Sequence, residues 1–195
     1  IVERTLAEAL VLTALLGAPL KNAEGQLTLQ AQTENGAISM LVCDYKDGAL
    51  RGYAQFDPLR LAELPPDATL FGLFGKGYLA ITFDRDLPVG EGGGRYQGIV
   101  PLEGESLCAA ATAYFAQSEQ IPTRLHLFAG PIMQKGEKHT HWRAGAILIQ
   151  HLPREGGVTP VAFSSGDGPE GYDDGVEEND DWVKARLILD TVEDH

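Results

Sequence analysis

The sequence predicts a single domain of the α+β class, with antiparallel or mixed β-sheets and packed helices. At 195 residues the chain is long enough for one domain, which would bury roughly 70% of the surface that its unfolded form exposes. Short stretches of alternating apolar and polar residues predict strands, and tight-turn dipeptides join several of them. Helical stretches accompany these strands without alternating with them one by one, which favours α+β over repeated βαβ units.

Residues 1–20 predict an amphipathic helix that ends at Gly17 and Pro19. Its apolar residues recur at helical spacing, and they are Val2, Leu6, Ala9 and Leu10. Charged side chains interrupt the apolar stretch, so a signal peptide or a membrane-spanning helix is not expected. The stretch starts abruptly and without Met, from which we expect that an upstream segment has been left out of this sequence.

Three strands are predicted next, at 26–33, 37–45 and 49–56, and they form an antiparallel meander. Asn35-Gly36 and Asp47-Gly48 supply the positive φ angles that the intervening turns need. The second strand is apolar on both faces, so part of the second face must be covered. We expect one face to pack under the helices, with Ile38, Met40 and Val42 beside Leu27 and Leu29. The other face would then carry Leu41 beside Tyr53.

The rest of the core is predicted to contain two helices and four more strands. The helices are expected at 58–64 and 104–117, and the strands at 77–84, 95–102, 124–130 and 143–152. Ala111, Tyr114 and Phe115 have the spacing of core residues. We therefore assign residues 1–153 to one core domain.

The last third of the chain differs in composition from the core. Residues 154–181 are rich in acids, Gly and Pro, which predicts a surface linker or loop. Residues 182–195 predict a terminal helix with one apolar stripe, formed by Trp182, Ala185, Leu189 and Val192.

Charge and cysteine content exclude several partners and cofactors. The net charge of −13 would repel a phosphate backbone, so no nucleic acid is expected as a partner. Cys43 and Cys108 are far apart in sequence and neither lies in a CxxC motif, which predicts neither a disulfide framework nor a zinc site in this chain. Such sparse cysteine use is typical of a reducing cytosol.

No motif for catalysis is complete, so we predict no catalytic residues and no enzyme. The stretch FGLFGKGYL lacks the spacing of a phosphate-binding loop and is interpreted as a tight turn before a strand. GEGGGRYQG fails the dinucleotide-binding pattern and is interpreted as a hairpin loop, and no serine lies in a GxSxG elbow. His139 and His141 lack a carboxylate or a cysteine at ligand spacing, even with His126 or His151, so no metal site is predicted.

Several separated stretches nevertheless form a specific pattern. YQGIVPLEGESL is followed by YFAQSEQIPTRL, and GKGYLAIT, LAEALVLTALLGAPLK, GQLTLQAQ, RGYAQ and AGAILIQHLP occur around them. In this order they resemble the 33 kDa chaperonin family, the redox-regulated holdase chaperones of the bacterial cytosol. The resemblance covers residue 1 to about residue 153 and is weak beyond it.

The resemblance implies an ATP-independent chaperone that binds unfolded or partly folded client proteins in the cytoplasm, and it leaves a homodimer open. Such an amino-terminal domain is an α+β body that presents an apolar client-binding surface, for which Leu41 and Tyr53 are our candidate residues. In the family, a carboxy-terminal switch binds zinc through four cysteines in CxC and CxxC pairs. Nothing here matches that switch, so zinc is expected only in a region absent from this sequence.

Two other functions remain open from the sequence. A domain that binds a small molecule could share the fold, because fold does not fix function. A constitutive protein-interaction module without redox control is the second alternative, since the switch cysteines are missing.

Overall fold

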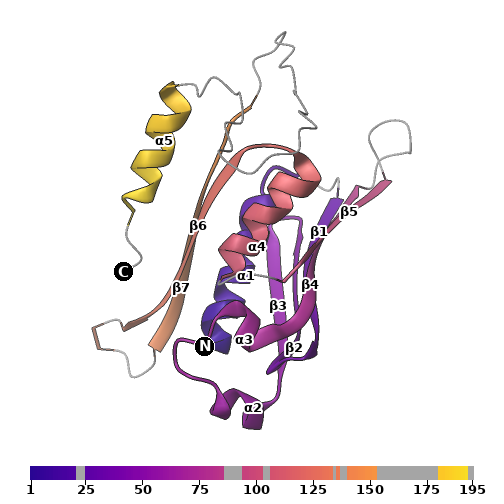
Figure 1. Ribbon diagram of the computed structural model, residues 1–195, viewed down its shortest axis with the longest axis vertical. Coiled ribbons are helices and arrows are strands. Elements are labelled where there is room, and N and C mark those ends of the chain that lie inside the picture. Colours follow the sequence, from indigo (N-terminus) through magenta and orange to yellow (C-terminus); the bar gives the residue numbers. More distant parts are fainter. Residues whose placement is uncertain are drawn as a thin grey trace, which may run out of the picture.

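The computed structural model describes residues 1–20, 25–85, 94–102, 106–133, 135–136, 140–152 and 180–192. It is built as successive layers, which Figure 1 shows from the side. A five-stranded sheet forms one outer layer and a two-stranded sheet lies opposite it, with helices between them. The predicted α+β class is confirmed, and both sheets are antiparallel.

The larger sheet has the strand order β3-β2-β1-β4-β5. Its strands are β1 (Gly25–Asn35), β2 (Ile38–Lys46), β3 (Ala49–Phe56), β4 (Gly75–Arg85) and β5 (Gly94–Pro101). The predicted meander of the first three strands is confirmed, and the turn residues Asn35 and Asp47 have the expected positive φ angles of 64° and 51°. Of the hairpin loop predicted at 90–98, residues 90–93 lie outside the described residues and residues 94–98 belong to β5.

The smaller sheet is a long hairpin of β6 (Thr123–Met133) and β7 (Thr140–Gln150). The helix α1 (Val2–Gly17) lies between the two sheets and contacts both (Figure 1). Ala9 and Leu12 of this helix are fully buried. α5 (Asp180–Asp190) packs on β6. It begins two residues before the predicted terminal helix, whose end lies outside the described residues.

The approach of α1 to the sheet depends on a missing side chain at Gly52 in β3. A Cβ atom there would lie 2.9 Å from Leu10 Cδ2 and 3.0 Å from Leu6 Cδ1. Glycine therefore lets the apolar stripe of the helix rest directly on the strand. This contact identifies the face of the larger sheet that the helices cover.

Two short helical segments connect β3 to β4. α2 (Pro58–Glu63) confirms the helix predicted at 58–64, and the Asp57 side chain caps it by accepting from the backbone N–H groups of Leu59 and Arg60. α3 (Leu70–Phe74) lies where a tight turn was predicted. The turn prediction is wrong because Leu73 and Phe74 join the core, and Gly75, with φ of 63°, ends the helix.

The helix predicted at 104–117 is also different in the structure. α4 spans Leu107–Tyr114, and the chain then widens into a π-helix at Phe115–Glu119. The side chain of Ser106 caps the start of α4 by accepting from the backbone N–H of Ala109 at 3.2 Å. The core positions predicted in this helix are confirmed, since Ala111, Tyr114 and Phe115 are buried.

Candidate functional site

On the face of the larger sheet that is turned away from α1, polar side chains from all five strands lie side by side and form a row across the sheet. Residues that are paired with one another across the strands in this way are said to lie at one level. Cross-strand neighbours at this level are Arg51, Asp44, Thr28, Thr82 and Gln97. The Thr28 hydroxyl donates to Asp44 Oδ1 at 2.7 Å, and Arg51 Nε donates to Asp44 Oδ2 at 2.7 Å. Burial alone would raise the pKa of Asp44, but these hydrogen bonds outweigh it and the pKa lies below its ordinary value. The row is therefore held in one arrangement by paired polar groups.

Beside this row, apolar side chains gather on the same face, and we call them the open-face band. One level contains Tyr53, Val42, Gln30, Ala80 and Ile99 across the five strands, and the next contains Gln55, Met40, Gln32, Tyr78 and Pro101. The band consists of the apolar members of both levels, which are Met40, Val42, Tyr53, Tyr78, Ala80, Ile99 and Pro101.

The band is accessible from solvent except at Ala80, which is 3% exposed. Tyr53 is 57% exposed and Ile99 is 55% exposed, and they lie on the two opposite edge strands, β3 and β5. Tyr78 is also exposed, and its hydroxyl donates to Gln32 Oε1 at 2.9 Å in the middle of the sheet. Exposed apolar side chains thus lie on both sides of β1, which contributes Gln30 and Gln32 at these two levels. Tyr53 and Ile99 are separated by a width of about 19 Å, taking about 4.8 Å between neighbouring strands. Accessible apolar side chains gathered on one face in this way are typical of an interaction site.

The prediction that Leu41 lies on the open face beside Tyr53 is wrong. Leu41 is only 1% exposed and belongs to the core. The register pairs Ala31 with Leu41 and Leu29 with Cys43, so these four residues share the face under α1. Leu41 therefore cannot contact a client in the folded domain.

The prediction that Met40 and Val42 pack under the helices is also wrong. Met40 and Val42 pair with Gln32 and Gln30, so they lie on the open face and not beside Leu27 and Leu29. Of the three β2 residues predicted to be in the core, which are Ile38, Met40 and Val42, Ile38 is fully buried. The strand has a register shift between Ile38 and Met40, so Ile38 points to the helix-covered face although it is two residues from Met40. Tyr53 lies on the open face as predicted, with Val42 as its neighbour.

Comparison with known proteins identifies the family of this fold. A model of the family described as Hsp33 protein matches residues 1–188. The chain belongs to the Hsp33 family. It is 39% identical over 195 residues to the 33 kDa chaperonin of Caulobacter vibrioides (strain NA1000 / CB15N), an alignment that covers 98% of this chain and 56% of the relative.

Further members of the Hsp33 family give a consistent result. The 33 kDa chaperonin of Aliivibrio salmonicida (strain LFI1238) is 38% identical over 192 residues, covering 98% of this chain and 53% of the relative. The crystal structure of the 33 kDa chaperonin from Thermotoga maritima matches with a TM-score of 0.56 and 25% identity, covering 75% of this chain and 47% of that chain. The chain thus spans about half the length of the curated relatives that it matches.

The two cysteines of this Hsp33 chain do not fit a zinc site. Cys43 is buried in β2, whereas Cys108 lies in α4 and its thiol donates to the Leu125 carbonyl oxygen at 2.7 Å. A structural zinc site needs four ligands that converge on one point. Within the described part of the chain, no group of three or more His, Cys, Asp or Glu side chains is placed to hold a metal ion. His139, considered above as a ligand, lies outside the described residues.

We expect Cys43 to be chemically inert in the folded protein. Burial raises the pKa of its thiol to about 12, although a hydrogen bond with the Thr13 side chain acts in the opposite direction. At pH 8 only about one thiol in ten thousand would be ionised, and the thiolate is the reactive form. Iodoacetamide followed by mass spectrometry should leave Cys43 unmodified until denaturant is added. Rapid modification of the native protein at Cys43 would show that the thiol is accessible and activated.

One signal in the sequence could have located the open-face band. Asp44 is two residues from Val42 and four from Met40, so in a regular strand the three side chains point to the same face. A charged side chain is placed toward solvent unless it is paired in the interior. Asp44 therefore indicates that Met40 and Val42 face outward, whereas Leu41 and Cys43 face the core. Ile99 and Tyr78 could not be added from local sequence, because their place in the band depends on the pairing of β4 and β5 with β1.

The described part of the chain also gives a finding about membranes. None of its helices has both the length and the apolar content needed to cross a bilayer.

Proposed function

We propose that this domain is an ATP-independent holdase chaperone that binds unfolded or partly folded proteins through the open-face band. The observation that supports this most strongly is the exposure of large apolar side chains on both edge strands of the open face, Tyr53 on β3 and Ile99 on β5. Unfolded clients expose apolar side chains of their own, and burying a large one contributes about 1.5–3 kcal/mol before the costs of association. Contacts of this kind require no nucleotide and no catalytic group.

The names of the relatives, each a 33 kDa chaperonin, support the same proposal. The net charge of −13 would keep a complex of chaperone and client in solution through like-charge repulsion. We place this activity in the cytoplasm, in agreement with the sparse cysteine content.

We further propose that redox regulation of the full-length protein, with zinc as its cofactor, belongs to a region outside these 195 residues. The sequence contains two cysteines, and four would be needed to bind zinc through thiolates alone. Residues 1–195 by themselves should therefore act as a constitutive holdase.

The test is the aggregation of a heat-labile enzyme, followed by light scattering in the presence of purified residues 1–195. We expect suppression without ATP, added metal or oxidant, and to the same extent in reducing and oxidising buffer. A heat-stable acidic protein of similar size serves as the control for non-specific effects. Failure of the domain to suppress aggregation beyond this control would overturn the holdase assignment for these residues.

A further inference from the structure

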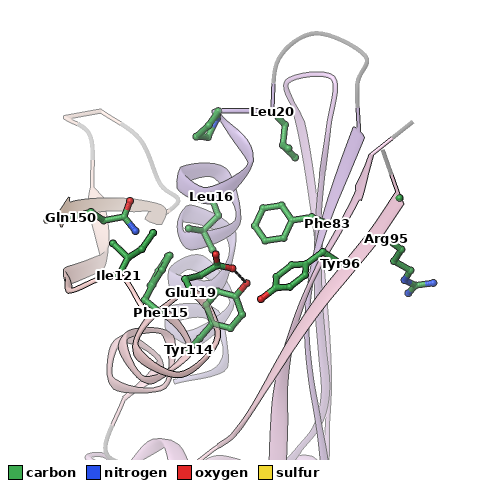
Figure 2. A pocket seen from close by; sticks show the side chains of 12 residues that line it. Leu16, Leu20, Phe83, Arg95, Tyr96, Tyr114, Phe115, Glu119, Ile121 and Gln150 are labelled. Atoms are coloured by element: carbon green, nitrogen blue, oxygen red, sulfur yellow. Dashed lines mark hydrogen bonds between the residues drawn. The ribbon is translucent and has the colours of Figure 1, made fainter. Parts of the chain in front are cut away.

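A cleft with aromatic walls lies on the helix-covered side of the larger sheet, away from the open-face band. Its volume is about 690 Å³, which is within the usual range for sites that hold small molecules. Figure 2 shows the side chains that line it, which come from the end of α1, from β4 and β5, and from the π-helix. Phe83 and Tyr96 line one wall with ring centroids 6.4 Å apart, and Tyr114 and Phe115 line another with ring centroids 5.4 Å apart.

The π-helix places a carboxylate among these rings. The backbone N–H of Gln120 donates to the Phe115 carbonyl oxygen, an i→i+5 bond that widens the turn. In an α-helix, side chains five residues apart would lie about 140° apart around the axis. In the wider turn Glu119 instead faces Tyr114, and the Tyr114 hydroxyl donates to Glu119 Oε1 at 2.8 Å (Figure 2). π-helical turns of this kind are frequent at functional sites.

The contacts of Tyr114 hold this arrangement in place. Tyr114 is buried, and a Cβ atom at Gly98 of β5 would collide with its ring. Burial, followed by the neighbouring Glu119, raises the pKa of Tyr114 above its ordinary value, so the hydroxyl stays protonated and donates to the carboxylate. The Tyr96 hydroxyl donates to the Ser118 carbonyl oxygen at 3.4 Å, so both tyrosine donors already have acceptors.

The charge inside the cleft is negative. Glu119 points into it, whereas the guanidinium of Arg95 is directed away and lies 3.8 Å from Asp84 (Figure 2). The Arg95 side chain is largely exposed, so its charge does not neutralise Glu119 inside the cleft. The remaining wall is mainly apolar, with Leu16, Leu20 and Ile121.

We propose that this cleft binds a small organic cation, an ammonium group carried on an apolar body. The faces of aromatic rings are negative and attract cations, and a carboxylate among them adds a charged hydrogen-bond acceptor. A carboxylate has about four lone-pair sites, so Glu119 can accept from an ammonium group while it accepts from Tyr114. The apolar wall around Leu16 and Ile121 would take up the body of the ligand. This site is separate from the open-face band and does not depend on the holdase proposal.

The test compares three ligands that share an indole body: tryptamine, which is a cation at pH 7, neutral tryptophol, and anionic indole-3-propionate. Affinities are measured by titration of two-dimensional NMR spectra of residues 1–195. We expect tryptamine to bind at least about tenfold more tightly than tryptophol, with shifts at Tyr96, Glu119 and Ile121, and indole-3-propionate to bind most weakly. Equal affinity for the amine and the alcohol, or no saturable shifts at these residues at millimolar tryptamine, would overturn the proposal.

Two variants test the groups that provide the preference for a cation. Glu119→Gln removes the charge and should clearly reduce the preference for tryptamine over tryptophol, leaving only the part that the rings provide. Phe83→Leu removes one ring while keeping the wall apolar, and should weaken binding of tryptamine more than that of tryptophol. Glu63→Gln on the exposed helix α2 is the matched control and should leave both affinities unchanged. Each variant is first shown to melt like the parent, and an undiminished preference for tryptamine in folded Glu119→Gln would contradict the site.

Discussion

Leu41→Glu should unfold the domain. Leu41 is 1% exposed and lies in the core under α1, beside Leu29 and Cys43 on the same face of the sheet. Among the described residues, the buried cluster that surrounds this position consists of apolar side chains. Burying a charged group without a partner costs several kcal/mol, which is comparable to the total stability of about 5–15 kcal/mol expected for a domain.

Circular dichroism and thermal melting measure this effect. We expect the Leu41→Glu protein to show no cooperative melting transition at 25 °C and above, whereas Leu41→Ala should remain folded with a stability lowered by about 2–5 kcal/mol. Tyr53→Glu on the neighbouring strand introduces the same side chain at a position that is 57% exposed, so it should melt like the parent. A parent-like melting temperature for Leu41→Glu would show that Leu41 is not part of the core.

The second large effect concerns function. Tyr53→Glu combined with Ile99→Glu should greatly weaken the suppression of client aggregation while leaving the fold intact. Both side chains are more than half exposed, so the new carboxylates stay hydrated and cost little stability. A client that covers the open-face band would have to remove water from these charges, and it would also lose two apolar contacts.

We expect the double variant to require at least about ten times more protein for half-maximal suppression, which corresponds to about 1.4 kcal/mol of lost binding free energy. The matched control is Leu59→Glu with Met133→Glu, because these side chains are 79% and 74% exposed and lie outside the band. Both double variants carry the same change in charge. Equal loss in the two proteins would mean that added negative charge, and not the open-face band, determines suppression.

Most of the strand and helix order could be predicted from local patterns. Alternation and the turns at Asn35 and Asp47 predicted the meander of β1, β2 and β3 because a tight turn needs residues that accept positive φ. The interruption of α4 could not be predicted in this way. The π-helix begins directly after Tyr114, whose ring packs against Gly98 of β5, and this contact between distant parts of the chain is not visible in local sequence.

The face of β2 shows why a strand that is apolar on both sides is difficult to interpret. A change of one residue in register moves every side chain to the other face, and the apolar pattern of β2 is compatible with both arrangements. The hydrogen bond between Thr28 and Asp44 shows which arrangement forms, because it pairs the polar positions of β1 and β2 on the open face. The sequence predicts Leu41 and Tyr53 on one face, whereas in the structure Tyr53 is exposed on the open face and Leu41 is buried on the other.

The cleft near Glu119 could not be predicted from the sequence at all. Its walls come from α1, β4, β5 and the π-helix, and no short motif joins Leu16, Phe83 and Glu119. Sequence patterns predicted Tyr114 and Phe115 as core residues, which is confirmed, but not that their rings also line a cleft.

Photo-crosslinking tests most directly the claim that clients bind the open-face band. Benzoylphenylalanine is introduced at position 53 in one protein and at position 59 on α2 in another, and each is irradiated with a client during heating. Both positions are accessible, so a difference between them reports the location of the client and not access to solvent. The proposal predicts strong crosslinks to the client from position 53 and few from position 59. Crosslinks from position 59 that equal or exceed those from position 53 would contradict it.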